Sequence, residues 1–176
     1  MDRETRIAIL VDHYNRPRHK HALENADARI PGGNPGCGDL VTMYVKAEPG
    51  SERIDQVSFE GAGCTISQAA ASILADRVNK EHWTFSQALE YSPEKMMDLL
   101  GRDIVDARPG CATLALGTLK AAVKVIETDR SLRAAGKSDE EIRKLREEVA
   151  ARAAGPAFVV GKEALELSPQ PHEEGR

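Results

Sequence analysis

The sequence contains few aromatic residues and very few cysteines. Phenylalanine, tryptophan and tyrosine together make up 4% of the 176 residues, so aliphatic residues and methionine must fill any hydrophobic core. Hydrophobic residues of all kinds reach 41%, which is enough for such a core. The length fits one domain of ordinary size with some residues to spare.

An excess of positive charge is also missing, as are long apolar runs. The formal net charge is −4, which argues against a nucleic-acid partner because phosphate contacts require clustered lysine and arginine. No apolar run has the length of a membrane-spanning helix, and the first residues lack the apolar stretch of a secretion signal. We therefore expect a cytoplasmic chain without a membrane partner, whose thiols stay reduced.

Hydrophobic periodicity predicts an α+β fold. Val41, Met43 and Val45 alternate along one predicted strand, and Val57 and Phe59 share one face of the next, so the two are expected to form an antiparallel hairpin. The predicted elements are, in chain order, a helix over 3–14, a loop over 15–38, strands over 39–48 and 53–60, a helix from Cys64 to about Val78, and helices over 85–90, over 93–100 and from Cys111 onward.

The end of the chain differs in composition from the rest. We expect residues 1–127 to form the main domain and residues 128–176 a C-terminal extension. The polar stretch Asp129–Lys137 predicts a linker, and Ser138 followed three residues later by Glu141 predicts a capped helix over about 138–153. The tail from Ser168 is rich in proline and glutamate, which predicts disorder.

The three cysteines carry the chemistry of this sequence. Each lies in a glycine-containing turn, and thiolates suit iron, zinc and sulfur chemistry. Cys64 and Cys111 are predicted at helix N-termini, whose free N–H groups and partial positive charge lower a thiol pKa. Side chains two residues apart on an extended chain project to the same side, so Cys37 and Asp39 can face one ion together.

Spacing alone leaves a second interpretation open. The sequence contains no CxxC pair, and the separations of the cysteines match no simple zinc finger. A lone cysteine is often a small buried hydrophobic residue. A cytoplasmic interaction module with three buried cysteines therefore remains an alternative to a metal site.

Four ordered motifs resemble the U-type iron–sulfur cluster assembly scaffolds, the family of IscU, SufU and the N-terminal domain of NifU. The resemblance extends over roughly residues 3–127. The motifs are Asp12-His13-Tyr14-Asn15-Arg16-Pro17-Arg18, Asn34-Pro35-Gly36-Cys37-Gly38-Asp39, the segment from Phe59 to Ser67 with Ala71-Ser72 following, and Cys111-Ala112-Thr113-Leu114.

This resemblance implies a fold, a site and partners. The implied fold is a small antiparallel sheet of about three strands, packed by helices on one face, with the cysteines gathered at one exposed end. Cys37, Cys64 and Cys111 correspond to cluster-binding thiolates, and Asp39 to the aspartate of the family. Cys111 is the candidate persulfide acceptor, with a cysteine desulfurase as sulfur donor and client apoproteins or cluster carriers as recipients.

Two departures from IscU affect these expectations. Gly110 stands where IscU-type scaffolds have a histidine before the third cysteine, so the fourth ligand is expected to be Asp39 or a group from a partner. The LPPVK element read by a dedicated Hsp70 chaperone is absent, with Val105–Pro109 in its place, which disfavours that partner. In both respects the chain resembles SufU, although it lacks the extra segment that SufU carries before its third cysteine.

Two functional hypotheses follow from the resemblance. In the first, the protein is a scaffold that builds a transient cluster, of the [2Fe–2S] type, on Cys37, Cys64, Cys111 and Asp39. In the second, the same four groups hold zinc, and the protein is a sulfur acceptor that stimulates a cysteine desulfurase. In the first case the protein is no enzyme, and in the second it resembles a sulfurtransferase.

Overall fold

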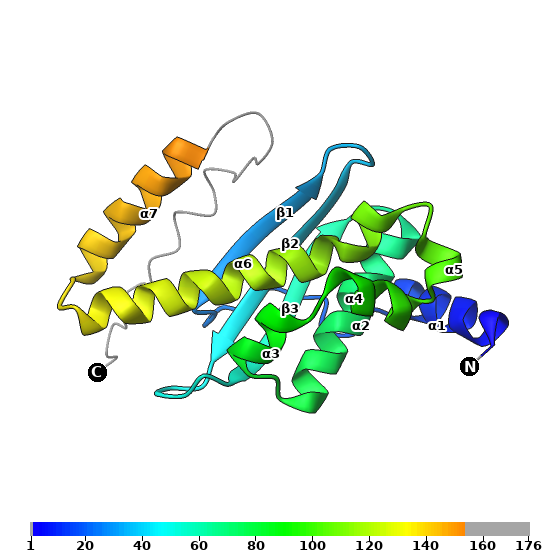
Figure 1. Cartoon of the computed structure of the whole chain (residues 1–176), viewed down its shortest axis with the longest axis horizontal. Helices are drawn as coiled ribbons and strands as arrows, with labels where there is room; N and C mark the ends of the chain where they lie inside the picture. The colour runs from blue at the N-terminus through cyan, green and yellow to red at the C-terminus, as the bar shows by residue number, and fades with distance from the viewer. Residues whose placement is uncertain (1, 154–176) are drawn as a thin grey trace, which may run out of the picture.

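A computed structural model describes residues 2–153. It contains a three-stranded antiparallel sheet in the order β1-β2-β3, with helices packed on one face (Figure 1). This confirms the predicted α+β class. The strands are β1 (Ala28–Asn34), β2 (Asp39–Ala47) and β3 (Ile54–Ala62); the helices are α1 (Arg3–Asn15), α2 (Thr65–Glu81), α3 (Phe85–Glu90), α4 (Pro93–Leu100), α5 (Arg102–Val105), α6 (Pro109–Ala134) and α7 (Asp139–Ala153).

The core lies between the sheet and helices α2 and α6. Alternate residues of the central strand β2 point into it, and Val41, Met43 and Val45 are almost completely buried. Helix α6 crosses β1 and β2, whereas α2 packs against β3 (Figure 1). By length and composition α6 is apolar enough to span a membrane, but half of its most apolar window is buried inside the protein, as in a core helix.

The prediction of a loop over residues 15–38 is wrong at residues 28–34, where the structure has strand β1. This strand contains Pro31 and the pair Gly32-Gly33, which disfavour strand formation in isolation. Its pairing with β2 stabilises it, and because β1 is an edge strand it tolerates a proline. A Cβ atom on Gly32 would lie 2.1 Å from Thr118 Oγ1 of α6, so glycine is needed for the close approach of that helix.

The linker predicted over Asp129–Lys137 is also wrong for most of its length, because α6 continues without a break to Ala134. The polar residues of its last turns have partners from distant parts of the chain. Asp129 is buried and forms an ion pair with Arg146 of α7. The guanidinium of Arg130 donates to the carbonyl of Glu48 at 2.9 Å and lies over the ring of Phe85.

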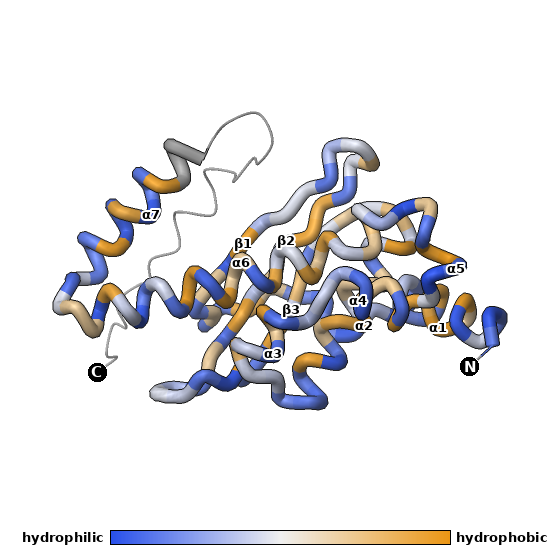
Figure 2. The backbone as a smooth tube through the Cα atoms, viewed as in Figure 1, coloured by the Kyte–Doolittle hydropathy of each residue, from blue (hydrophilic) through white to orange (hydrophobic). Residues whose placement is uncertain are grey.

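Helix α7 begins as the capping-box pattern predicts, because Ser138 and Glu141 exchange hydrogen bonds between side chain and backbone. Hydrophobic and charged residues alternate along it (Figure 2). Ile142 is buried, whereas Leu145 and Val149 are exposed. The tail predicted to be disordered from Ser168 lies outside the described residues.

The first sequence motif fixes α1 to α2. The hydroxyl oxygen of Ser72 accepts from the backbone N–H of Arg18 at 2.8 Å and lies 2.8 Å from His13 Nδ1. Ser72 is eight residues beyond Cys64, which corresponds to about 12 Å along the helix axis. The histidine of this motif therefore supports the fold rather than the cysteine site.

This contact predicts a pH dependence of stability. Burial, together with the nearby Arg18, holds the pKa of His13 below its ordinary value of 6.5. The unfolded chain therefore binds more protons than the folded one near and below that pH, so the unfolding free energy should fall as the pH drops through about 6.5. Urea unfolding at pH 8 and pH 5.5 measures this loss, and His13→Gln should reduce it.

The exposed His21, whose ring contacts only the neighbouring Ala22 carbonyl in the described hydrogen-bond network, provides a matched control. His21→Gln should leave the pH dependence unchanged. An equal slope in the wild type and in the His13→Gln variant would contradict the assignment.

Candidate functional site

The three cysteines lie at one end of the sheet. Cys37 is in the tight turn between β1 and β2, and Asp39 begins β2. Cys64 follows the end of β3 and is the N-cap residue of α2, whereas Cys111 is in the first turn of α6. Because neighbouring antiparallel strands begin and end at the same edge, the register that pairs Asn34 with Asp39 and Leu40 with Ala62 brings these segments together.

Ligand atoms of Cys37, Asp39 and Cys111 lie close enough together to hold one ion. Cys111 Sγ lies 3.3 Å from Cys37 Sγ, longer than a disulfide bond of about 2.05 Å, and all three cysteines are free thiols. One ligand atom from each of Cys37, Asp39 and Cys111 lies within 4.8 Å of the others. Cys64 is outside this group of three among the described residues, although its Sγ lies 3.8 Å from Asp39 Oδ2.

Asp39 is the central group of this arrangement. Its side chain is only 1% exposed, and its Oδ1 accepts from the backbone N–H of Cys64 at 2.7 Å. Burial acts to raise the pKa of Asp39, but hydrogen bonds from Cys111, Cys64 and Ser67 outweigh it and lower that pKa below its ordinary value. The carboxylate is therefore ionised at neutral pH and available as a hard donor.

The two helix-terminal cysteines differ in acidity. Burial acts to raise the pKa of Cys64, but hydrogen bonds from Ser67, whose N–H lies 3.4 Å from the sulfur, lower it below the ordinary thiol value. For Cys111 the predicted lowering is wrong. Burial first, and then the contacts with Asp39 and Cys37, raise the pKa of Cys111 strongly in the metal-free protein.

The cysteines also differ in exposure. Cys37 is exposed, Cys64 is partly buried and Cys111 is buried. The alternative of three separately buried cysteines is therefore contradicted. The exposed Cys37 and the buried Cys111 are nevertheless neighbours, because their sulfurs lie 3.3 Å apart.

Two glycines make room for the site. A Cβ atom on Gly63 would lie 2.4 Å from Asp39 Oδ1 and 2.7 Å from Ser67 Oγ. At Gly110 it would lie 3.0 Å from the side-chain nitrogen of Asn34. The space beside Gly110, the residue before Cys111, is thus occupied by the side-chain amide of Asn34.

The predicted residues are brought together, but sequence reasoning missed two of their neighbours. Ser67 donates to the sulfur of Cys64, and Asn34 donates to that of Cys111. Both are part of the motifs that contain the cysteines, so their proximity in sequence was an available signal. With the nearby Cys64 included, the candidate donors are three sulfurs and one buried, ionised carboxylate, a set that fits zinc or ferrous iron.

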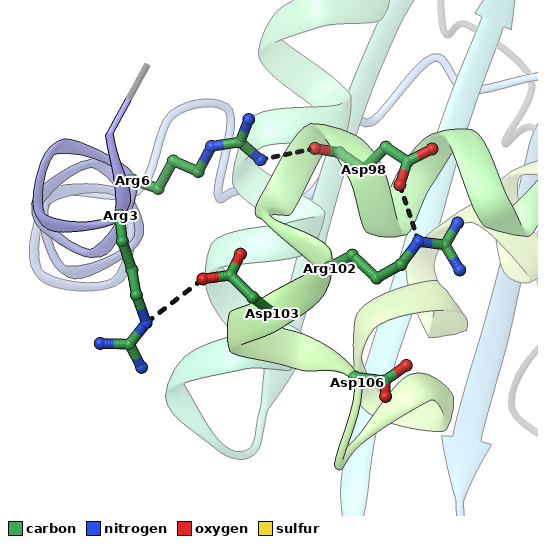
Figure 3. A pocket seen from close by; sticks show the side chains of 6 residues that line it. All are labelled: Arg3, Arg6, Asp98, Arg102, Asp103 and Asp106. Carbon is green, nitrogen blue, oxygen red and sulfur yellow. Dashed lines mark hydrogen bonds and ion pairs between the residues drawn. The ribbon is translucent and has the colours of Figure 1, made fainter.

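A second charged cluster lies elsewhere, in a shallow cleft between α1 and the α4–α5 segment (Figure 3). Arg3 pairs with Asp103 at 3.2 Å, and Arg102 pairs with Asp98 at 2.8 Å. Arg6 donates to the carbonyl of Asp98 at 3.0 Å. Because these arginines are engaged with neighbouring acceptors, the cleft supports the docking of α1 and includes none of the predicted site residues.

Comparisons with known proteins point to one family. The NifU-like N terminal domain matches residues 7–131. The iron-sulfur cluster assembly scaffold protein IscU of Streptococcus pyogenes serotype M1 is 32% identical over 133 residues, which covers 67% of this chain and 82% of that protein. The corresponding Thermotoga maritima protein is 34% identical over 131 residues, covering 66% of this chain and 91% of the relative.

Two further relatives carry the SufU name. The zinc-dependent sulfurtransferase SufU of Bacillus subtilis is 34% identical over 70 residues, covering 40% of this chain and 46% of that protein. The crystal structure of a putative scaffold protein for the SUF system from Fervidobacterium islandicum is 26% identical with a TM-score of 0.54, covering 65% of this chain and 93% of that one.

Proposed function

Because the chain belongs to the NifU-like N-terminal domain family, we propose that it is an iron–sulfur cluster assembly scaffold. In this role it accepts sulfur from a cysteine desulfurase, binds iron and builds a transient [2Fe–2S] cluster for transfer to client apoproteins or cluster carriers. Cys37, Cys64, Cys111 and Asp39 are the proposed ligands. Relatives named as such scaffolds support this assignment.

The observation that carries the proposal is the contact between Cys37 and Cys111 beside a buried carboxylate. Their sulfurs are 3.3 Å apart without a covalent bond, which places two soft donors at one position. Asp39 adds a hard oxygen donor to a predominantly soft set. This mismatch is expected to weaken the hold on a cluster and so favour its release.

Cys111 remains the proposed persulfide acceptor. Its thiolate attacks the sulfane sulfur of the desulfurase persulfide, a new S–S bond forms on Cys111, and the desulfurase cysteine leaves as a thiolate. Because Cys111 is buried and its thiol pKa is raised, the step requires the sulfur of Cys111 to become accessible and to lose its proton.

Anaerobic reconstitution with ferrous iron, sulfide and a reductant tests the scaffold function. We expect sulfide-to-iron charge-transfer absorption in the visible range, and its loss in the variant with all three cysteines replaced by serine. If the wild-type protein gives no such absorption, or if the triple variant gives the same spectrum, the scaffold function is wrong.

A zinc-dependent sulfur acceptor is the second candidate function, close behind the first, because three sulfurs and one carboxylate also suit zinc. Cys37, Cys64, Cys111 and Asp39 would hold the ion, whose charge keeps coordinated thiols deprotonated and so counteracts the raised pKa of Cys111. One tightly held zinc per chain after aerobic purification, with strong stimulation of a cysteine desulfurase, would support this function over the scaffold. The three cysteines form no disulfide in the described structure, which agrees with the proposed cytoplasmic location.

A further inference from the structure

Asn34 lies at the end of β1, opposite Asp39, and its side chain contacts the buried sulfur of the site. The amide nitrogen is 3.7 Å from Cys111 Sγ. The side-chain oxygen accepts from the N–H of Gly36 at 3.3 Å, which fixes the orientation of the amide and turns its N–H groups toward the sulfur. The backbone oxygen of Asn34 accepts from the N–H groups of Cys37 at 3.1 Å and Gly38 at 2.9 Å.

One residue therefore contacts both parts of the site. Through its oxygens it shapes the turn that carries Cys37, and through its nitrogen it contacts the sulfur on α6. The absence of a side chain at position 110 permits this, because a Cβ atom there would lie 3.0 Å from the amide nitrogen. That separation is tighter than an ordinary van der Waals contact, so the amide would have to move away.

We propose that Asn34 is a positioning residue of the metal centre, which donates a hydrogen bond to the Cys111 thiolate and aligns it with Cys37. This inference rests on the proposed function, since a thiolate at Cys111 requires a bound cation. A donor to a ligating sulfur stabilises its negative charge and withdraws electron density from it. Loss of such an outer partner typically lowers metal affinity about 10–100-fold.

Cobalt(II) is a suitable probe because its thiolate complexes absorb through sulfur-to-metal charge transfer. In Asn34→Ala we expect about a tenfold or greater loss of Co²⁺ affinity in a chelator competition. We also expect the charge-transfer band to move to longer wavelength, because a thiolate without the N–H donor is more electron-rich. A purely structural role of Asn34 would lower stability without moving the band.

Gly110→Ala tests the same contact without altering Asn34. The new methyl group displaces the amide from Cys111, so affinity and band position should change in the same direction as in Asn34→Ala. The double variant should be no weaker than Asn34→Ala alone, since both changes remove one interaction. Gly117→Ala is the matched control, because a Cβ atom at that glycine of α6 meets no heavy atom within 4 Å.

Thermal unfolding of the metal-free variants separates folding from ligand effects. If the wild type shows thiolate charge-transfer bands and both Asn34→Ala and Gly110→Ala show the same bands, the proposed role of Asn34 is wrong. The proposed metal centre would then remain intact. A wild-type protein that binds Co²⁺ without thiolate bands would overturn the metal centre itself, and the inference with it.

Discussion

Replacing Gly63 with alanine is expected to destroy the metal site, with a loss of Zn²⁺ or Co²⁺ affinity of at least about 100-fold, beyond the usual cost of losing one outer partner. The added Cβ would lie 2.4 Å from Asp39 Oδ1 and 2.7 Å from Ser67 Oγ. Asp39 Oδ1 accepts from the backbone N–H of Cys64, and Ser67 Oγ donates to the backbone carbonyl of Cys64. The methyl group therefore displaces the carboxylate and the hydroxyl that hold the backbone of Cys64, and overpacking of this kind costs about 1–3 kcal/mol of stability.

Metal affinity by chelator competition and the unfolding free energy in urea measure the two effects. Gly36→Ala is the matched control, because a Cβ atom at this neighbouring glycine makes only an ordinary contact of 3.5 Å with Asn34 Oδ1. It should bind metal like the wild type. Near-normal metal affinity in Gly63→Ala would show that metal binding does not depend on the present position of Asp39.

Asp39→Asn and Asp39→Ala should separate the structural part of this aspartate from its part in metal binding. Asparagine keeps an oxygen that accepts from the Cys64 N–H, so its stability should stay near that of the wild type. Alanine leaves that N–H without its acceptor, which costs about 1–3 kcal/mol. Both variants lose the anionic donor, and we expect at least a tenfold loss of Zn²⁺ affinity in each.

The comparison uses urea unfolding of the metal-free protein and zinc competition with a chromophoric chelator. Asp55→Asn removes the same charge from an exposed position on β3, where the carboxylate lies 3.9 Å from Lys46 Nζ. This control should change neither quantity. If Asp39→Asn binds zinc as tightly as the wild type, the fourth ligand is not this carboxylate.

Prediction of the secondary structure succeeded where the signals are local. The Ser92 cap before Pro93 and the pair Ser138–Glu141 involve groups within one helical turn, so a short sequence window contains the whole interaction. It failed for β1, whose proline and glycines disfavour a strand until β2 pairs with it. It also failed for the end of α6, where polar residues looked like a linker until their partners Arg146 and Glu48 were known.

The candidate site shows the same division. The glycine-containing turns predicted Cys37, Cys64, Cys111 and Asp39 as candidate site residues, and the structure brings them to one end of the sheet. The helix-terminus argument correctly gave the direction of the pKa shift for Cys64 and failed for Cys111. At Cys111, burial and neighbouring groups from other segments outweigh the local effect of the helix.

The amino-acid sequence alone determined which groups are candidates for the site and which turns hold them, since residue type and local backbone preference act over a few positions. Only the tertiary structure decided that Cys37 and Cys111, 74 positions apart, touch. It also decided that Cys111 is buried while Cys37 is exposed, and that Asn34 fills the space beside Gly110. These properties depend on distances between segments, which are set by packing of the sheet against α2 and α6.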